Sequence, residues 1–334
     1  MLSPVCERRA ARHWFTPWGT RGDGSANGSV ARLGWALFRR VRDSCEVGFR
    51  MGPGTGCETN SEKGEVIAVA LTLGDGPLTS RPPETVNYRI DGPAHRLLWQ
   101  DFPRRVRARF AGETVLDSSR GKLLHESNLL PRLYVPVEDV RAELLEPSTR
   151  HTHCPFKGDA EYHSVRVGDR VAESAVWRYP DPVEDASWLA GHLSVSWEAM
   201  DQWLDEEEEV LGHLRDPYHR VDVRETARHV RVSSGGVVLA ESGRAKLLSE
   251  TGLPNRFYLP AEDVRTELLE TSATTTVCPY KGTATYRSVR GEGLDLPDAV
   301  FRYEDPLPES AGIAGRYCFL AEDVTTTVDG TPVS

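Results

Sequence analysis

Residues 138–146 of the chain read EDVRAELLE, and residues 154–158 read CPFKG. The same pattern returns 124 residues later, where residues 262–270 read EDVRTELLE and residues 278–282 read CPYKG. A period of this length is typical of a duplicated domain, because the units of solenoid proteins are much shorter. The sequence therefore predicts two similar domains in tandem.

The offset of 124 residues holds without a gap from about residue 93 to residue 318. Its matches include PAHR at 93–96 with PYHR at 217–220, and AVWRY at 175–179 with AVFRY at 299–303. Residues 118–126 and 242–250 also match, with Ser, Arg, Lys, Leu, Leu and Glu at the same positions in both. We predict a first repeat domain at 71–210, with its core from 93, and a second at 211–330. An intramolecular pseudo-two-fold pairing of the repeats is expected.

Composition narrows the class of protein. The 334 residues are 39% apolar and 27% charged, as in ordinary globular proteins, and the net charge of −10 argues against a nucleic-acid partner. No apolar run approaches the roughly 20 residues of a membrane span, so no membrane association is expected. Six cysteines form no close pairs, which indicates neither a disulfide framework nor a zinc ribbon. We expect a cytoplasmic location.

Residues 1–70 differ from the rest of the chain. They lack any sustained hydrophobic period and contain the Gly- and Pro-rich run GPGTG at 52–56. One interpretation is a disordered N-terminal extension. The other is a start site assigned too early, because EKGE at 62–65 is compatible with a purine-rich ribosome-binding sequence just before alternative start codons.

Within each repeat the pattern is mainly β. Residues 104–116 alternate apolar and polar around a Gly-Glu turn, and residues 229–239 do so around Gly-Gly, as in hairpins. Residues 133–136 are expected to form a short strand. Apolar residues 137, 140, 144 and 145 instead follow a helical period and predict one short helix. A second, amphipathic helix is expected over 197–211. The fold class expected is a pair of compact β-sandwich or barrel-like (tent-like) domains, each with one short helix.

The strand after each CPxKG turn holds candidate site residues. Tyr162, Ser164 and Arg166 alternate onto one face, and the second copy repeats them as Tyr286, Ser288 and Arg290. Such a row predicts a pocket in which the arginine holds an anion. The alternative is that these groups satisfy one another and buried backbone.

The turn itself offers a thiol and an amine, Cys154 with Lys157 and Cys278 with Lys281. A nearby ammonium lowers a thiol pKa, which would suit a nucleophile. No histidine or acid is seen in the sequence to recur beside the cysteine in both copies, so a structural cysteine is the alternative. The histidines of HTHC at 151–154 are absent from the second copy, so neither a metal site nor a cofactor is expected.

Together these motifs resemble the domain-of-unknown-function 427 family, which also carries a nucleotidyltransferase-type label. The resemblance covers about residues 93–210 and 215–330, and it implies a small, mainly β, bacterial domain with no established activity. Its signature positions here are Tyr134, Cys154, Lys157, Tyr162, Ser164 and Trp177, with Tyr258, Cys278, Lys281, Tyr286, Ser288 and Phe301. The second copy departs from the family pattern by having Phe301 in place of tryptophan.

Three functions remain open from the sequence. The favoured one is a binding module for a small molecule, with an anion as one option, through the repeated Tyr-Ser-Arg face. The second is an enzyme that uses the Cys/Lys turn or a nucleotidyl-transfer activity such as the family label suggests. The third is a purely structural interaction protein.

Overall fold

The computed structural model of the chain describes residues 71–73, 76–80 and 86–333. The two interpretations of residues 1–70 lie outside the described residues. Within the described part, no helix is long and apolar enough to cross a membrane.

The described part of the first repeat folds into two antiparallel sheets. The larger sheet has seven strands in the order β1-β4-β5-β9-β8-β7-β6, and the smaller has four in the order β11-β10-β2-β3. Their bounds are β1 Leu97–Asp101, β2 Val106–Phe110, β3 Glu113–Ser118, β4 Lys122–Glu126, β5 Arg132–Pro136, β6 Leu145–Cys154, β7 Gly158–Val167, β8 Arg170–Arg178, β9 His192–Val195, β10 Gln202–Asp205 and β11 Glu208–Glu209.

The second repeat uses the same succession of strands. Its sheets have the orders β12-β15-β16, β17-β18-β19-β20 and β14-β13-β21-β22, and a bridge between Leu259 and Tyr317 links the first two. Their bounds are β12 Val221–Glu225, β13 Val230–Ser234, β14 Val237–Ser242, β15 Lys246–Glu250, β16 Arg256–Tyr258, β17 Leu269–Cys278, β18 Gly282–Gly291, β19 Leu294–Tyr303, β20 Tyr317–Phe319, β21 Thr325–Val328 and β22 Thr331–Val333. The mainly β class and the two expected hairpins are confirmed.

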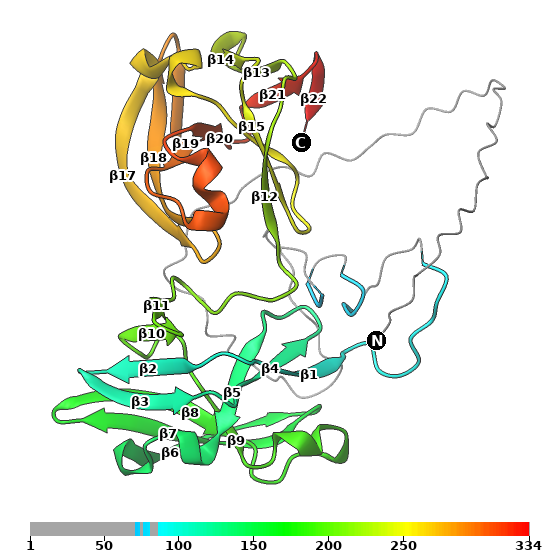
Figure 1. Cartoon of the computed structure of the whole chain (residues 1–334), viewed down its shortest axis with the longest axis vertical. Coiled ribbons are helices and arrows are strands. Elements are labelled where there is room, and N and C mark those ends of the chain that lie inside the picture. The colour runs from blue at the N-terminus through cyan, green and yellow to red at the C-terminus, as the bar shows by residue number, and fades with distance from the viewer. Residues whose placement is uncertain (1–70, 74–75, 81–85, 334) are drawn as a thin grey trace, which may run out of the picture. The chain divides into compact units, whose positions relative to one another are not determined.

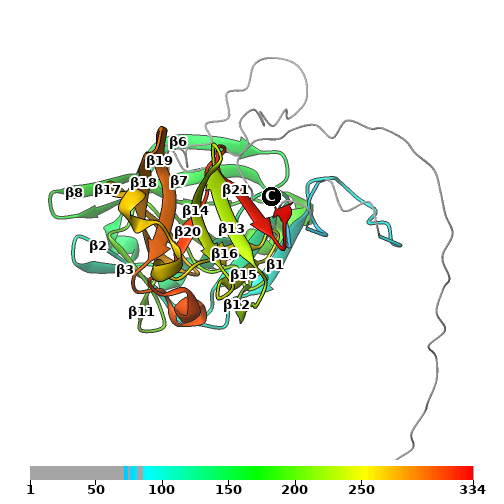
Figure 2. The ribbon, with the colours of Figure 1, turned by 90° about the horizontal axis from the view of Figure 1, so that it is seen from above.

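The core of each repeat lies between its sheets. In the first repeat, β2 and β3 of the smaller sheet lie against the larger sheet (Figure 1). Val106 and Leu116 of the smaller sheet share one apolar cluster with Val135, Val176 and Leu193 of the larger sheet. In the second repeat β13 runs between β14 and β21 (Figure 2), and Val230 and Val232 pack in the corresponding cluster. Alternation along each strand turns every second side chain into this core.

The short helix expected at residues 137–145 is wrong in position. The segment forms two single 3₁₀ turns, η1 (Val137–Asp139) and η2 (Ala142–Leu144), separated by an extended Val140 with φ −116° and ψ 136°. Val140 makes a β-bridge with Leu116, and the Arg141 N–H donates to the Val115 carbonyl at 3.0 Å. Because the backbone of residues 140 and 141 pairs with β3, it is not available for the hydrogen bonds of a continuous helix, although the apolar residues follow a helical period. The second repeat forms η4 (Ala261–Asp263) and η5 (Thr266–Leu268) in the same way.

The amphipathic helix expected over residues 197–211 is also wrong. This segment contains β10, which pairs with β2, and β11, which pairs with β10. Trp197 and Trp203 stack with ring centroids 4.3 Å apart, so the apolar residues of this segment lie in a turn and in strand β10. Pairing with β2 gives the backbone of β10 its hydrogen-bond partners, and these bonds stabilise the extended form over a helix.

Each repeat has one six-residue helical segment, η3 (Glu184–Leu189) and η6 (Pro308–Ile313). Ala186 and Leu189 of η3 are buried against the face of the larger sheet that points away from the sandwich core, where Leu124, Tyr134 and Tyr179 form a second apolar cluster. The larger sheet is thus buried on both faces, and the candidate site lies on this outer one.

Candidate functional site

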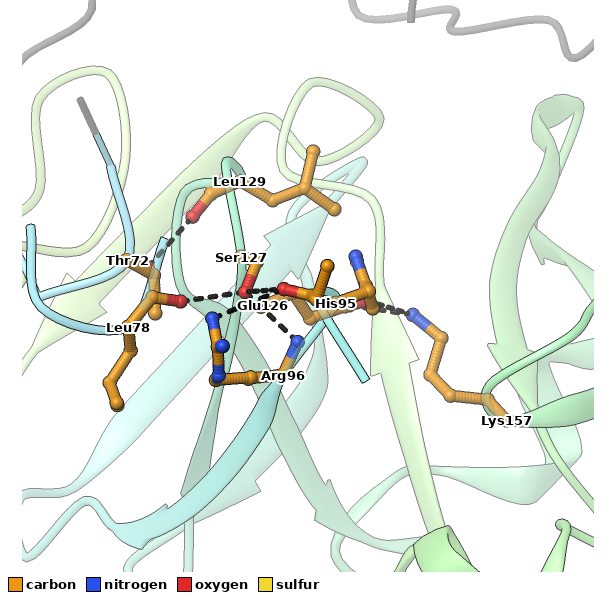
Figure 3. Close-up of polar contacts among 9 residues, drawn as sticks. Thr72, Leu78, His95, Arg96, Glu126, Ser127, Leu129 and Lys157 are labelled. Atoms are coloured by element: carbon orange, nitrogen blue, oxygen red, sulfur yellow. Dashed lines mark hydrogen bonds and ion pairs between the residues drawn. The ribbon is translucent and has the colours of Figure 1, made fainter. Parts of the chain in front are cut away.

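A buried ion pair joins the end of β4 to the turn before β7. The Lys157 ammonium donates to both carboxylate oxygens of Glu126 at 2.6 Å, and the two residues are only 8% and 6% exposed. The imidazole Nε2 of His95, which lies just before β1, is 3.3 Å from the same carboxylate. Figure 3 draws the side chains of His95, Glu126 and Lys157 together, with Lys157 on the right. We call these three residues the charged triad of the first repeat.

The second repeat builds an equivalent charged triad from His219, Glu250 and Lys281. The His219 Nε2 lies 3.0 Å from one oxygen of Glu250, and the Lys281 Nζ lies 2.5 Å from the other. An aromatic side chain of the CPxKG turn stacks on each imidazole, Phe156 on His95 at 4.3 Å and Tyr280 on His219 at 4.2 Å. The recurring aromatic in that motif therefore covers the histidine.

The first-repeat triad is braced from the turn after Glu126. The Ser127 hydroxyl donates to the Leu78 carbonyl at 2.6 Å (Figure 3), and the Asn128 N–H donates to the Thr72 carbonyl at 2.6 Å. Residues 71–73 and 76–80 thus fix the turn that carries the carboxylate. A further bond of this turn is common to both repeats: the Ser127 N–H donates to the Arg96 carbonyl at 3.0 Å, and the Thr251 N–H donates to the Arg220 carbonyl at 2.9 Å.

Both carboxylates are held ionised. Burial alone would raise the pKa of Glu250, but the hydrogen bond with His219 and the charge of Lys281 outweigh it and lower the pKa to about 2. The same balance lowers the pKa of Glu126. An ionised acid beside an ammonium is close to neutral as a unit, so each Glu–Lys pair can be buried without a net charge.

The tyrosines around each triad stay protonated. Burial raises the pKa of Tyr134 and Tyr179 in the first repeat, and of Tyr258 and Tyr303 in the second, far above the ordinary value for a phenol. A protonated phenol donates a hydrogen bond, so these side chains present donors to whatever lies beside them.

Many of the residues predicted from the sequence lie together around the triads. In the first repeat Tyr134 is in the outer cluster, and Cys154, Tyr162 and Trp177 pack against it. A pocket in the second repeat is lined by the corresponding residues Tyr258, Cys278, Lys281, Tyr286 and Phe301.

Four other predicted residues are engaged elsewhere. Arg166 is exposed and its Nε donates to Glu146 at 2.6 Å, while Arg290 pairs with Glu270 and Asp295. The Ser164 hydroxyl accepts the Ser174 N–H at 3.0 Å, and the Ser288 hydroxyl accepts the Asp298 N–H at 3.1 Å. Both serines stabilise a β-bulge, where the register of β7 with β8 and of β18 with β19 shifts.

The sequence interpretation missed residues that complete the site. A histidine and an acid recur at the lysine of the CPxKG turn in both copies, and in the second copy they line one pocket with Cys278. They come from segments distant in the sequence, so only their common offset of 124 residues pointed to them. Arg132 and Arg256 also recur: their guanidinium carbons lie 5.4 and 5.8 Å from the ring centroids of Trp177 and Phe301.

The copies differ at one hydrogen bond. In the first repeat the Trp177 Nε1 donates to the Tyr134 hydroxyl at 3.3 Å. Phe301 replaces this tryptophan in the second repeat, and the Tyr258 hydroxyl, fully buried, has no hydrogen-bond partner among the described residues. Unpaired buried hydroxyls are rare in proteins, and this one lines the pocket.

The described residues contain no group of three or more His, Cys, Asp or Glu side chains that could hold a metal ion. No curated protein matches the chain. The model of the domain of unknown function DUF427 matches residues 99–206 and 222–330, one match over each repeat. These two matches cover more than half of the 334 residues, and the chain therefore belongs to the DUF427 family, of which it holds two tandem copies.

Proposed function

We propose that the protein is a small-molecule-binding module and that the second-repeat pocket takes an anionic group. The observation that carries this proposal is the buried Tyr258 hydroxyl without a partner among the described residues. A buried polar group left unpaired costs about 1–3 kcal/mol, and a ligand oxygen at that point would remove the cost.

The Arg256 guanidinium is the cation available to an anion in this pocket, which Asp216, Glu250 and Lys281 also line. Arg256 lies two positions before Tyr258 in β16, so both side chains are on one face of the strand, and both line the pocket. Within the described residues Arg256 has no carboxylate partner, whereas Lys281 is neutralised by Glu250. A guanidinium and a phenol that face one pocket suit a carboxylate or a phosphate oxygen. The rings of Tyr286, Phe301 and Tyr303 offer contacts for an apolar part of the ligand.

A thermal-shift screen with phosphate, benzoate and adenosine monophosphate tests the proposal, because a ligand at 100 times its Kd stabilises a protein by about 2.7 kcal/mol. Binding of the best anion is then compared in wild type, Arg256→Gln and Tyr258→Phe. We expect Tyr258→Phe to weaken binding about tenfold or more while stability stays the same or rises, since it removes an unpaired hydroxyl. Tyr134→Phe in the first repeat is the matched control and should leave this binding unchanged.

Two results would contradict the proposal. One is the absence of a shift with every anion tested. The other is anion binding that neither Arg256→Gln nor Tyr258→Phe weakens. Arg166→Ala provides a further comparison, because Arg166 is already paired with Glu146 at the surface and should not contribute.

A thiol enzyme is the second candidate, and one observation favours it. Cys278 lines the same pocket as His219 and Glu250, so a histidine and an acid accompany the thiol after all. Iodoacetamide labelling across pH separates the candidates: alkylation of Cys278 well below the ordinary thiol pKa of about 8.5 would support the enzyme. Alkylation only above that pH would leave the binding module as the better description.

We also retain the finer predictions made from the sequence. A cytoplasmic location is supported by Cys154, Cys278 and Cys318, which are free thiols. The absence of nucleic-acid partners is supported by the net charge of −10. A bacterial source and a pseudo-two-fold pairing of the repeats stay predictions, as do the domain boundaries at residues 70 and 210.

A further inference from the structure

The first repeat has a groove of about 950 Å³ that is separate from the charged triad. Its floor is apolar and includes Val115, Val140, Val176 and Leu193, and Arg178 and His163 stand at its side. Val176 precedes Trp177 in β8 and therefore points to the opposite face of the larger sheet. The groove thus opens on the sandwich side of the sheet, beside η1 and η2.

The second repeat fills the corresponding place with one of its own side chains. Tyr317 stands at the position of Leu193 and is 7% exposed. Its hydroxyl accepts a hydrogen bond from Nη1 of Arg302, the counterpart of Arg178, at 2.8 Å. The Arg302 guanidinium carbon also lies 4.9 Å from the Tyr317 ring centroid. One repeat therefore shows a phenol ring seated against this arginine.

The first repeat keeps the arginine but has lost the phenol. Among the described residues Arg178 donates one hydrogen bond, from Nη2 to Glu161 at 3.2 Å. Its Nη1, the atom that in Arg302 donates to Tyr317, donates to no described residue. Leucine at position 193 has neither the ring nor the hydroxyl of tyrosine. The Arg178 guanidinium therefore has hydrogen-bond donors without a protein partner beside the apolar floor of the groove. This is the position at which Tyr317 contacts Arg302 in the second repeat.

The charges of the groove favour a neutral ligand over an anion. The Arg141 guanidinium is paired with Glu113 and Glu143, and Arg178 with Glu161. Glu138 and Asp139 are paired in turn with Arg120. A phenol brings an acceptor oxygen and an aromatic face without a charge, and the arginine can use both.

We propose that the first-repeat groove binds a small phenolic group, with its ring on Val176 and Leu193 and its oxygen on Arg178, as Tyr317 lies on Arg302 in the second repeat. This site is distinct from the anion pocket and does not depend on it. The chemistry is shared by a free phenol and by a tyrosyl side chain.

Saturation-transfer NMR with p-cresol, N-acetyl-tyrosinamide and toluene tests the proposal on the full chain. Toluene has the ring of p-cresol but lacks its hydroxyl. We expect p-cresol to bind about tenfold more tightly than toluene, and Arg178→Gln to abolish this preference. Leu193→Tyr should fill the groove and weaken p-cresol binding at least about tenfold, whereas Leu193→Met, which conserves side-chain volume, should leave it unchanged. Binding of N-acetyl-tyrosinamide as well would identify a tyrosyl side chain as an accepted form of the phenol.

Three results would overturn the proposal: no saturation transfer to p-cresol, equal p-cresol binding by wild type and Leu193→Tyr, or a p-cresol preference that Arg178→Gln leaves intact. If Leu193→Tyr does not fold, the ratio of p-cresol to toluene binding in Arg178→Gln decides alone, because Arg178 is partly exposed. Tyr317→Leu supplies an independent gain of function. It should open the second-repeat groove and add a p-cresol site.

Discussion

The charged triads of the two repeats are nearly identical, whereas their surroundings are not. In both repeats a glutamate at the end of a strand contacts a lysine and a histidine. The two glutamates occupy equivalent positions, 124 residues apart. In the first repeat three further rings gather outside the triad. Trp99 lies 4.8 Å from Trp188, 5.5 Å from Tyr134 and 5.2 Å from His192, measured between ring centroids.

The second repeat has Val223, Gly312 and Arg316 in place of Trp99, Trp188 and His192. Gly312 allows η6 to approach β12 closely, because a Cβ at Gly312 would lie 2.9 Å from the Val223 side chain. The two repeats therefore share the buried charged triad but differ in the aromatic residues that surround it. We infer from this contrast that the triad stabilises the same local structure in both repeats. The surrounding residues that differ then determine which ligand each site binds.

The largest effect should come from breaking a triad. Lys281→Met leaves the Glu250 carboxylate buried without its ammonium, and we expect it to destabilise the second repeat by about 3–5 kcal/mol. Lys157→Met should destabilise the first repeat to a similar extent, because Glu126 and Lys157 are just as buried. Urea denaturation followed separately for each repeat measures both.

The double variant Lys281→Met with Glu250→Gln is the control. Removal of both charges should recover much of the loss, since neither is then left unpaired. A cost below about 1 kcal/mol for Lys281→Met would show that the pair behaves like an exposed one and that the triad is not the common frame.

The sequence predicted the strands better than the site. Alternation around the Gly-Gly pair at 235–236 is a local property, and the hairpin β13–β14 followed from it. The helical period at residues 137–145 was misleading, because the bridge from Val140 to Leu116 depends on a strand formed elsewhere. Half of the site was visible as the CPxKG turn, but His95 and Glu126 reach Lys157 only once the larger sheet has formed.

The stability of the protein at low pH should show whether Glu250 contributes more to the free energy of unfolding than an ordinary carboxylate does. Its pKa in the folded protein is lowered from 4.5 to about 2, so its stabilisation is present above pH 4.5 and is lost as the pH falls through 2. The difference corresponds to about 3 kcal/mol. Urea denaturation at several pH values should show this loss for wild type, and Glu250→Gln should be less sensitive to pH between 4.5 and 2. Equal slopes for the two proteins would contradict the buried pairing, and Glu126→Gln offers the same test in the first repeat.

The smallest effect concerns the hydrogen bond that only one copy makes. Trp177→Phe gives the first repeat the side chain of the second, and we expect it to cost about 1–3 kcal/mol because the Tyr134 hydroxyl loses its donor. Adding Tyr134→Phe to that variant should recover part of the cost, since no unpaired hydroxyl then remains. Tyr258→Phe should cost nothing in the second repeat, where Phe301 already stands. A double-mutant cycle of Trp177→Phe with Tyr134→Phe should give a coupling of about 1 kcal/mol. A cost of about 1 kcal/mol or more for Tyr258→Phe alone would contradict an unpaired hydroxyl in the second repeat.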